Sequence, residues 1–238
     1  MGRMSNAKTP ATKGNSKAAL ADKGEVDAFL AALNRTPSAA GSGRLLFALD
    51  ATMSRQRTWD SACHIQADMF REASSVNGLA MKLIYFRGFD ECRASAWKTD
   101  GKALAKSMAG IECLGGHTQI SRVLAFARKQ IAEAPVPALV YIGDAVEENP
   151  DRLSHQAGEL GLLGCKLFMF HEGRDPIAGR TFKSMAKASG GGYFQLDARS
   201  AETLASLLKA VARYASGGRT ALESANSGAG RLLLEQMQ

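Results

Sequence analysis

Apolar runs of strand length alternate with longer segments of helical period from residue 44 onward. The run at 45–49 is apolar throughout, which predicts a strand buried on both faces, and further strands are predicted at 138–142 and 166–170. The longer segments have apolar residues three and four positions apart and predict helices. These segments are 58–76, 101–108, 119–133, 150–163, 179–188 and 202–214.

Two further strands are predicted to form a hairpin. The segment 79–86 is largely apolar, and 91–97 alternates apolar with polar side chains, as a half-exposed edge strand does. Only a short turn at Gly88 joins them, so they are expected to run antiparallel. With a last strand at 193–196, the pattern predicts an α/β fold. The sheet is expected to be doubly wound, six-stranded and mostly parallel, with one antiparallel edge strand and helices on both faces, as in Rossmann-like proteins.

The remaining segments flank this alternation. Residues 1–24 are rich in Lys, Ala, Ser and Gly, which predicts a disordered basic tail because few large apolar groups offset the entropy of ordering. A short amphipathic helix and a linker are expected over 25–43, and the α/β domain over 44–216. The C-terminal tail, 217–238, is expected to be loose until three consecutive leucines that would dock as a short helix.

Composition adds expectations about compartment and partners. The chain has 238 residues and a formal net charge of +7, which suits an acidic partner. No apolar run is long enough for a membrane span, and the first residues lack the apolar core of a signal peptide, so we expect a cytoplasmic protein without membrane contact. The four cysteines have no CxxC spacing and are expected to be reduced.

Oxygen-bearing side chains gather where the predicted strands end. Asp50, Thr52 and Ser54 follow the first strand, Thr118 lies in a glycine-containing loop before a helix, and Asp144 follows the strand 138–142. Ligands of parallel sheets bind beyond the carboxyl ends of the strands. The three loops therefore bring two carboxylates and three hydroxyls toward one expected binding edge.

These residues resemble the metal-ion-dependent adhesion site, or MIDAS, of the von Willebrand factor A (VWA) family. Asp50, Thr52 and Ser54 match the family's D-x-S-x-S loop, with Thr in place of the first Ser, while Thr118 and Asp144 match its later Thr and Asp. The resemblance covers roughly 44–214 and is to VWA domains of the bacterial intracellular type. It implies that these five residues hold one divalent cation, Mg²⁺ or alternatively Mn²⁺ or Ca²⁺, directly or through water.

The chemistry of such a site explains what it would bind. Mg²⁺ prefers oxygen ligands and keeps several waters. Because hydroxyls are neutral, the ion remains electrophilic and an Asp or Glu of a partner takes the open position. The resemblance therefore implies a non-enzymatic, cation-dependent adaptor module that binds an acidic side chain of a protein, with an AAA+ ATPase as one candidate partner.

Three alternatives to a metal-dependent adaptor fit parts of the same sequence. Asp50 and the hydroxyls after it could simply form an Asx-turn or a helix N-cap. A Mg²⁺-dependent phosphoesterase acting through Asp50 is a second hypothesis, although Thr52 stands where such enzymes place their acid/base Asp. A nucleic-acid-binding module driven by the basic charge is a third, but the basic tail lacks interleaved aromatic residues.

Neighbouring residues carry subsidiary expectations. Gly115 and Gly116 are expected to take positive φ so that Thr118 turns toward the ion, and Gly143 to allow close approach. His117 is expected at the rim of the site rather than as a ligand.

Charged residues also flank the predicted ligands. Arg55 and Arg57 follow the first loop, and Glu147 and Glu148 follow Asp144. Two interpretations are open for these four residues. They are either an ordinary solvated surface, or the arginines attract an acidic partner while the glutamates tune the cation.

Overall fold

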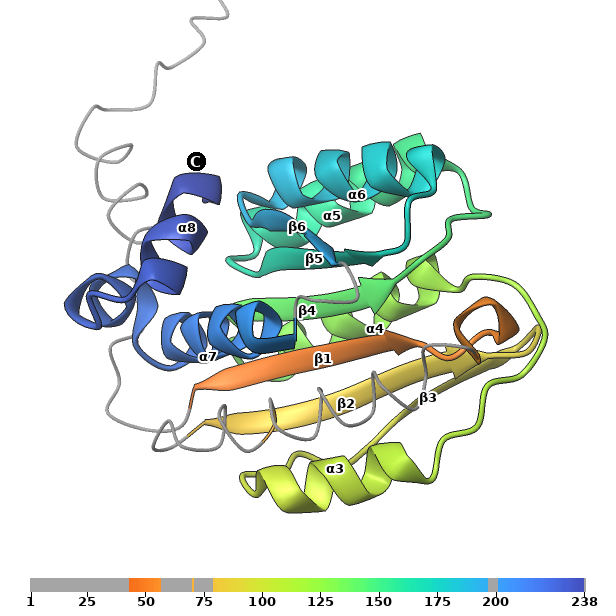
Figure 1. Ribbon diagram of the computed structural model, residues 1–238, viewed down its shortest axis with the longest axis horizontal. Coiled ribbons are helices and arrows are strands. Elements are labelled where there is room, and N and C mark those ends of the chain that lie inside the picture. The colour runs from red at the N-terminus through yellow and green to blue at the C-terminus, as the bar shows by residue number, and fades with distance from the viewer. Residues whose placement is uncertain (1–42, 57–69, 71–78, 197–200, 238) are drawn as a thin grey trace, which may run out of the picture. The chain divides into compact units, whose positions relative to one another are not determined.

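The computed structural model describes residues 43–56, 70, 79–196 and 201–237 (Figure 1). The expected disordered tail, the short helix and the linker before the domain lie outside the described residues, as does most of the helix expected at 58–76. Within the described part, six strands form one sheet in the order β3-β2-β1-β4-β5-β6. The predicted six-stranded sheet is therefore confirmed.

The strand directions also agree with the prediction. All neighbouring strands pair in parallel except β2 and β3, which are antiparallel and place β3 at one edge of the sheet. The strands are β1 (Arg44–Asp50), β2 (Ala80–Arg87), β3 (Glu91–Ala94), β4 (Ala138–Gly143), β5 (Lys166–Glu172) and β6 (Gly192–Leu196).

Helices cover both faces of the sheet. One face packs against α4 (Ile120–Glu133), α5 (Pro150–Leu162) and α6 (Pro176–Ser189). The other packs against α3 (Gly101–Ala109), α7 (Ala201–Ser224) and α8 (Gly228–Gln236). In Figure 1, α7 lies in front of the sheet and α4 behind it.

The alternation of side chains along β1 decides where its last residue points. Leu46 and Ala48 belong to the core on the α4 face, whereas Phe47 and Leu49 belong to the core on the α7 face. Successive side chains of a strand point to opposite faces. Asp50, the last residue of β1, therefore points to the α4 face.

The C-terminal residues differ from the expectation of a loose tail. The range of α7 holds two helical segments that meet at a kink at Gly218, whose φ is 67°, and the second segment ends at Ser224; α8 follows it as the docked short helix. Leu222 and Leu233 are buried in the core on the α7 face. The backbone of Gly218 is not helical, so the chain breaks its helix there, and the residues beyond form a second helical segment because their apolar side chains have a core to enter.

Candidate functional site

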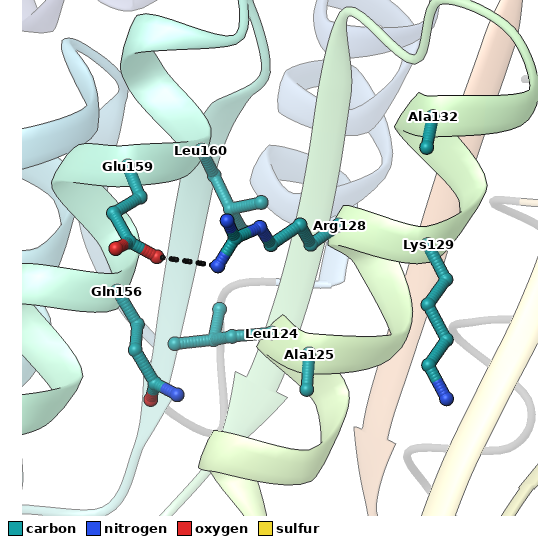
Figure 2. A pocket seen from close by; sticks show the side chains of 8 residues that line it. All are labelled: Leu124, Ala125, Arg128, Lys129, Ala132, Gln156, Glu159 and Leu160. Atoms are coloured by element: carbon teal, nitrogen blue, oxygen red, sulfur yellow. Dashed lines mark hydrogen bonds and ion pairs between the residues drawn. The ribbon is translucent and has the colours of Figure 1, made fainter.

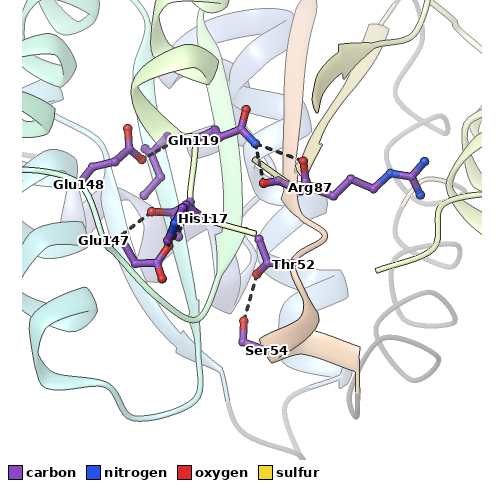
Figure 3. Close-up of polar contacts among 10 residues, drawn as sticks. Thr52, Ser54, Arg87, His117, Gln119, Glu147 and Glu148 are labelled. Carbon is purple, nitrogen blue, oxygen red and sulfur yellow. Dashed lines mark hydrogen bonds and ion pairs between the residues drawn. The ribbon is translucent and has the colours of Figure 1, made fainter. Parts of the chain in front are cut away.

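Four of the five predicted ligands are joined by one chain of hydrogen bonds at the carboxyl ends of β1 and β4. The backbone N–H of Thr52 donates to Asp50 Oδ1 at 2.8 Å. The hydroxyls of Thr52 and Ser54 lie 3.0 Å apart, and the Ser54 hydroxyl donates to Asp144 Oδ1 at 3.0 Å. Figure 3 shows the hydroxyls of Thr52 and Ser54 facing each other. Two separate loops therefore converge on one group of oxygen atoms.

The loop after β1 is held by its neighbours on both sides. Ala51 N–H donates to the carbonyl of Phe86 on β2 at 3.0 Å, and the Ala51 carbonyl accepts from Leu114 N–H at 3.1 Å. Thr52 also pairs with Leu114 in an isolated β-bridge, after which a 3₁₀ turn covers Met53–Arg55. These backbone contacts fix the positions from which the side chains of Thr52 and Ser54 project.

Asp50 is a buried carboxyl with an unused oxygen. Its side chain is fully buried, and Asp50 Oδ2 has no hydrogen-bond partner among the described residues. Burial raises the pKa of Asp50 to about 6, against the opposing effects of the Thr52 hydrogen bonds and of Arg55. The bond from Thr52 N–H is the Asx-turn considered from sequence, but it occupies only Oδ1. A buried oxygen without a partner is uncommon in native proteins and is suited to a cation or its water.

Asp144 is the outer carboxylate of the group. It is half-buried, and burial raises its pKa while the hydrogen bond from Ser54 and the charge of Arg55 lower it. In the described part of the chain, no cluster of three or more His, Cys, Asp or Glu side chains is arranged to hold a metal. Any cation here would depend on two carboxylates supplemented by neutral hydroxyls, which is a donor set that hard cations accept.

Thr118 does not join this chain of hydrogen bonds. Its hydroxyl accepts from Glu147 N–H at 3.0 Å, and its own N–H donates to Glu147 Oε2 at 2.8 Å. No hydrogen bond links it to Asp50, Thr52 or Ser54 among the described residues. Thr118 is thus tied to the loop that carries Asp144, and its role as a ligand remains a prediction.

Arg55 is not a surface arginine. Its side chain is 1% exposed; Nε donates to Glu172 Oε2 at 2.7 Å, and one terminal nitrogen donates to the Asp50 carbonyl at 2.6 Å. Both interpretations made from sequence, a solvated residue or one that attracts a partner, are therefore wrong for Arg55, because the 3₁₀ turn directs it beneath the loop. Arg57 lies outside the described residues.

The two glutamates after Asp144 hold the loop before α4. Glu148 accepts from the N–H groups of Ile120 and Ser121, where α4 begins. Glu147 accepts from Thr118 N–H and lies 3.2 Å from His117 Nδ1; Figure 3 shows Glu147 and His117 facing each other. A carboxylate at a helix N-terminus satisfies free N–H groups and the helix dipole. These contacts account for both residues without a cation.

The glycines serve close packing rather than positive φ. Neither Gly115 nor Gly116 has a positive φ, so that expectation is wrong. A Cβ on Gly116 would lie 1.9 Å from the Gly88 carbonyl oxygen, so residue 116 must be glycine for the two loops to touch. A Cβ on Gly143 would lie 2.7 Å from the Tyr141 hydroxyl, as expected for a position of close approach.

A surface groove away from these loops was not predicted from sequence. It lies between α4 and α5 and has a volume of about 400 Å³. Figure 2 shows Arg128 and Glu159 paired across it at 3.3 Å, beside Leu124 and Leu160. None of the five predicted ligands lines this groove.

Comparison with known proteins gives structural but not sequence matches. No protein-family model matches the chain, and no curated protein matches it significantly. A von Willebrand factor type A protein from Catenulispora acidiphila superimposes with a TM-score of 0.60 at 16% identity, over 74% of this chain and 43% of that one. The present chain therefore spans less than half of that protein's length.

For two further solved structures, the match covers nearly the whole length of the neighbour. The SpRpn10 VWA domain gives a TM-score of 0.58 at 10% identity, over 69% of this chain and 94% of that one. The vWF domain of the type V pili tip protein Mfa5 from Porphyromonas gingivalis gives a TM-score of 0.53 at 10% identity, over 73% of this chain and 94% of that one. Together with the sheet order and its antiparallel edge, these matches show that the chain has the fold of a von Willebrand factor A domain.

Proposed function

We propose that this chain is a cation-dependent protein-binding module. Its loops would hold one divalent cation, Mg²⁺ or alternatively Mn²⁺ or Ca²⁺, between Asp50, Thr52, Ser54 and Asp144, with Thr118 in the adjoining loop. The observation that carries the proposal is the hydrogen-bonded group of four residues that ends in the buried, unpartnered Asp50 Oδ2. When bound, the cation would supply an electrophilic centre for a carboxylate.

The burial of the four side chains decides which side of the ion a partner would meet. Asp50 and Thr52 are buried, Asp144 is half-buried and Ser54 is exposed. A cation among them would be anchored from the protein side and open toward solvent. An Asp or Glu of a partner is the ligand that this opening favours, because the protein contributes only two carboxylates.

Apolar side chains near the site support a protein as the partner. Met53, Phe89 and Leu114 are exposed by 51%, 69% and 49%. Leu114 is bonded to Ala51 through its N–H, and its carbonyl accepts from Gly88 N–H at 3.5 Å, so these residues belong to adjoining loops. We call Met53, Phe89 and Leu114 the apolar rim. Exposed apolar groups beside a polar centre are typical of protein-binding surfaces.

The adaptor role and an AAA+ ATPase as partner rest on the VWA resemblance alone. Among the structural neighbours, one is a domain of a pilus tip protein and another is the VWA domain of SpRpn10. These neighbours share the fold and support a binding module as the class of function. Within the described residues, no helix combines the length and apolar character that crossing a membrane requires.

The alternative functions receive less support. Asp50 is fully buried, which disfavours its attack on a phosphoester. Hydrolysis of p-nitrophenyl phosphate with Mg²⁺, abolished by Asp50→Asn, would nevertheless replace the binding proposal. The nucleic-acid alternative predicts retention on heparin that falls steeply with salt.

Calorimetric titration with Mg²⁺ and Mn²⁺ tests the metal site. We expect one cation per chain for the wild type and none for Asp50→Ala. Asp90→Ala is the matched control, since the Asp90 side chain is 92% exposed and pairs only with Arg122 among the described contacts. Affinity capture with Mg²⁺ or with EDTA then tests the partner. Wild-type protein that binds no cation, or capture unaffected by EDTA, contradicts the proposal.

A further inference from the structure

A second buried polar atom without a partner lies on β4, the strand next to the one that carries Asp50. The Tyr141 hydroxyl on β4 has no hydrogen-bond partner among the described residues, and its side chain is 1% exposed. Asp50 Oδ2 is the corresponding unpartnered acceptor. A phenol is protonated at neutral pH and can donate a hydrogen bond, whereas an ionised carboxylate can only accept one. The two groups are therefore chemically complementary.

The sheet register places both groups on the same face. Tyr141 pairs with Ala48 of β1, and both belong to the core on the α4 face. Asp50 lies two residues beyond Ala48 and points to that face as well. Tyr141 and Asp50 are thus on neighbouring strands and the same face. Tyr141 is two residues farther from the carboxyl end of the sheet than Asp50, and its longer side chain can span that difference.

Gly143 explains how the Tyr141 hydroxyl reaches the end of the strand. A Cβ at residue 143 would lie 2.7 Å from the hydroxyl oxygen, so the phenol occupies the space that a side chain would fill. Leu49 pairs with Ile142, which puts Gly143 at the level of Asp50. The negative charge of Asp50 is, after burial, the largest influence that raises the pKa of Tyr141, as expected for neighbours.

We propose that Tyr141 is a positioning residue for the candidate metal site: its hydroxyl donates to one buried water, which donates in turn to Asp50 Oδ2. Each carboxylate oxygen has two acceptor directions, so this bond leaves room for a cation. It fixes the plane of the carboxylate and favours its ionised form. The bond is independent of the proposed function, whereas its effect on cation affinity rests on it.

The phenylalanine variant is a conservative test. Tyr141→Phe keeps the ring contacts with Phe86 and Phe182, whose centroids lie 6.4 Å and 5.3 Å away, and removes only the hydroxyl. Tyr214→Phe is the matched control, because Tyr214 is buried in the core on the opposite face. Both variants are expected to fold.

Proton NMR of the metal-free chain tests the bond itself. We expect a downfield, slowly exchanging hydroxyl resonance that disappears in Tyr141→Phe, moves upfield in Asp50→Asn and persists in Tyr214→Phe. Mn²⁺ titration tests the consequence: Tyr141→Phe should weaken affinity about ten-fold and Tyr214→Phe should not, in keeping with one lost hydrogen bond to a charged group.

The two measurements separate the possible failures. A hydroxyl resonance that is missing in the wild type, or unmoved in Asp50→Asn, overturns the bond. If Tyr141→Phe binds Mn²⁺ as tightly as the wild type, the positioning role is wrong. If the wild type binds no Mn²⁺ while the resonance behaves as expected, the metal function fails and the hydrogen bond stands.

Discussion

Arg55 Nε lies 2.7 Å from Glu172 Oε2, and this ion pair joins the loop after β1 to the end of β5 although β4 lies between those strands. The same arginine donates to the Asp50 carbonyl at 2.6 Å. One buried cationic side chain therefore holds the backbone of the candidate site and a carboxylate two strands away. Its charge also lowers the pKa of Asp50 and of Asp144, against the larger effect of burial.

Replacing Arg55 should destabilise the fold. We expect Arg55→Met to reduce the free energy of unfolding by about 3 kcal/mol, because it leaves the Asp50 carbonyl and Glu172 without their donor. Arg128→Met is the control: this arginine is 64% exposed and its pair with Glu159 should contribute less than about 0.5 kcal/mol. Urea denaturation measures both variants, and equal losses would contradict the structural role of Arg55.

Much of the fold could be predicted from the periodicity of apolar residues. The apolar run at 45–49 became β1 at Arg44–Asp50, and the alternation after the turn at Gly88 became the antiparallel edge strand. Both follow from local patterns that burial imposes on a strand. The second helical segment beyond the kink at Gly218 could not be predicted this way, because it depends on a core that receives Leu222.

The candidate site was predictable to the extent that it follows from topology. Asp50 ends β1 and Asp144 follows the adjacent parallel strand β4, so their convergence is a consequence of the strand order. The burial of Arg55 and the position of the Tyr141 hydroxyl beside Gly143 could not be predicted from the local sequence. An arginine after a polar loop is indistinguishable from a surface residue, and a tyrosine in an apolar strand from ordinary core, until tertiary packing is known.

Asp50→Asn should stabilise the metal-free protein at neutral pH while it abolishes cation binding. The folded-state pKa of Asp50, about 6, exceeds the ordinary value of 3.8. The folded state therefore retains its proton longer than the unfolded state, and wild-type stability falls as pH rises from about 4 to about 6.

Asn cannot ionise and therefore removes this loss of stability. The loss is at most about 3 kcal/mol, because each unit of difference between the folded and unfolded pKa corresponds to about 1.36 kcal/mol. Urea denaturation in EDTA at pH 4 and pH 8 measures the difference between Asp50→Asn and the wild type, with Asp90→Asn as the exposed control. A variant that is less stable than the wild type at pH 8 would show that the Asp50 carboxylate is stabilising.

Cation affinity should fall in mild acid. Binding requires the ionised form of Asp50, so protons compete with the cation below about pH 6. One competing proton lowers the apparent affinity about ten-fold per pH unit, and burial also raises the pKa of Asp144, which makes the decline steeper. Mn²⁺ titrations at pH 7.5 and pH 5 measure it. An affinity that does not change over this interval would argue against carboxylate ligands at these positions.

The apolar rim should contribute to partner binding without contributing to the metal site. Leu114→Ser and Phe89→Ser remove exposed apolar contacts beside the proposed cation, so metal-dependent capture of the partner should weaken about ten-fold for each. Neither side chain offers an oxygen ligand in the wild type, and Mn²⁺ affinity should stay unchanged. Leu162→Ser is the matched control, since Leu162 is 82% exposed at the end of α5, away from the loops of the site. If the rim variants weaken Mn²⁺ binding as much as they weaken partner capture, the rim acts by shaping the loop of Thr52. If they change neither Mn²⁺ affinity nor partner capture, the partner contacts the metal from another side.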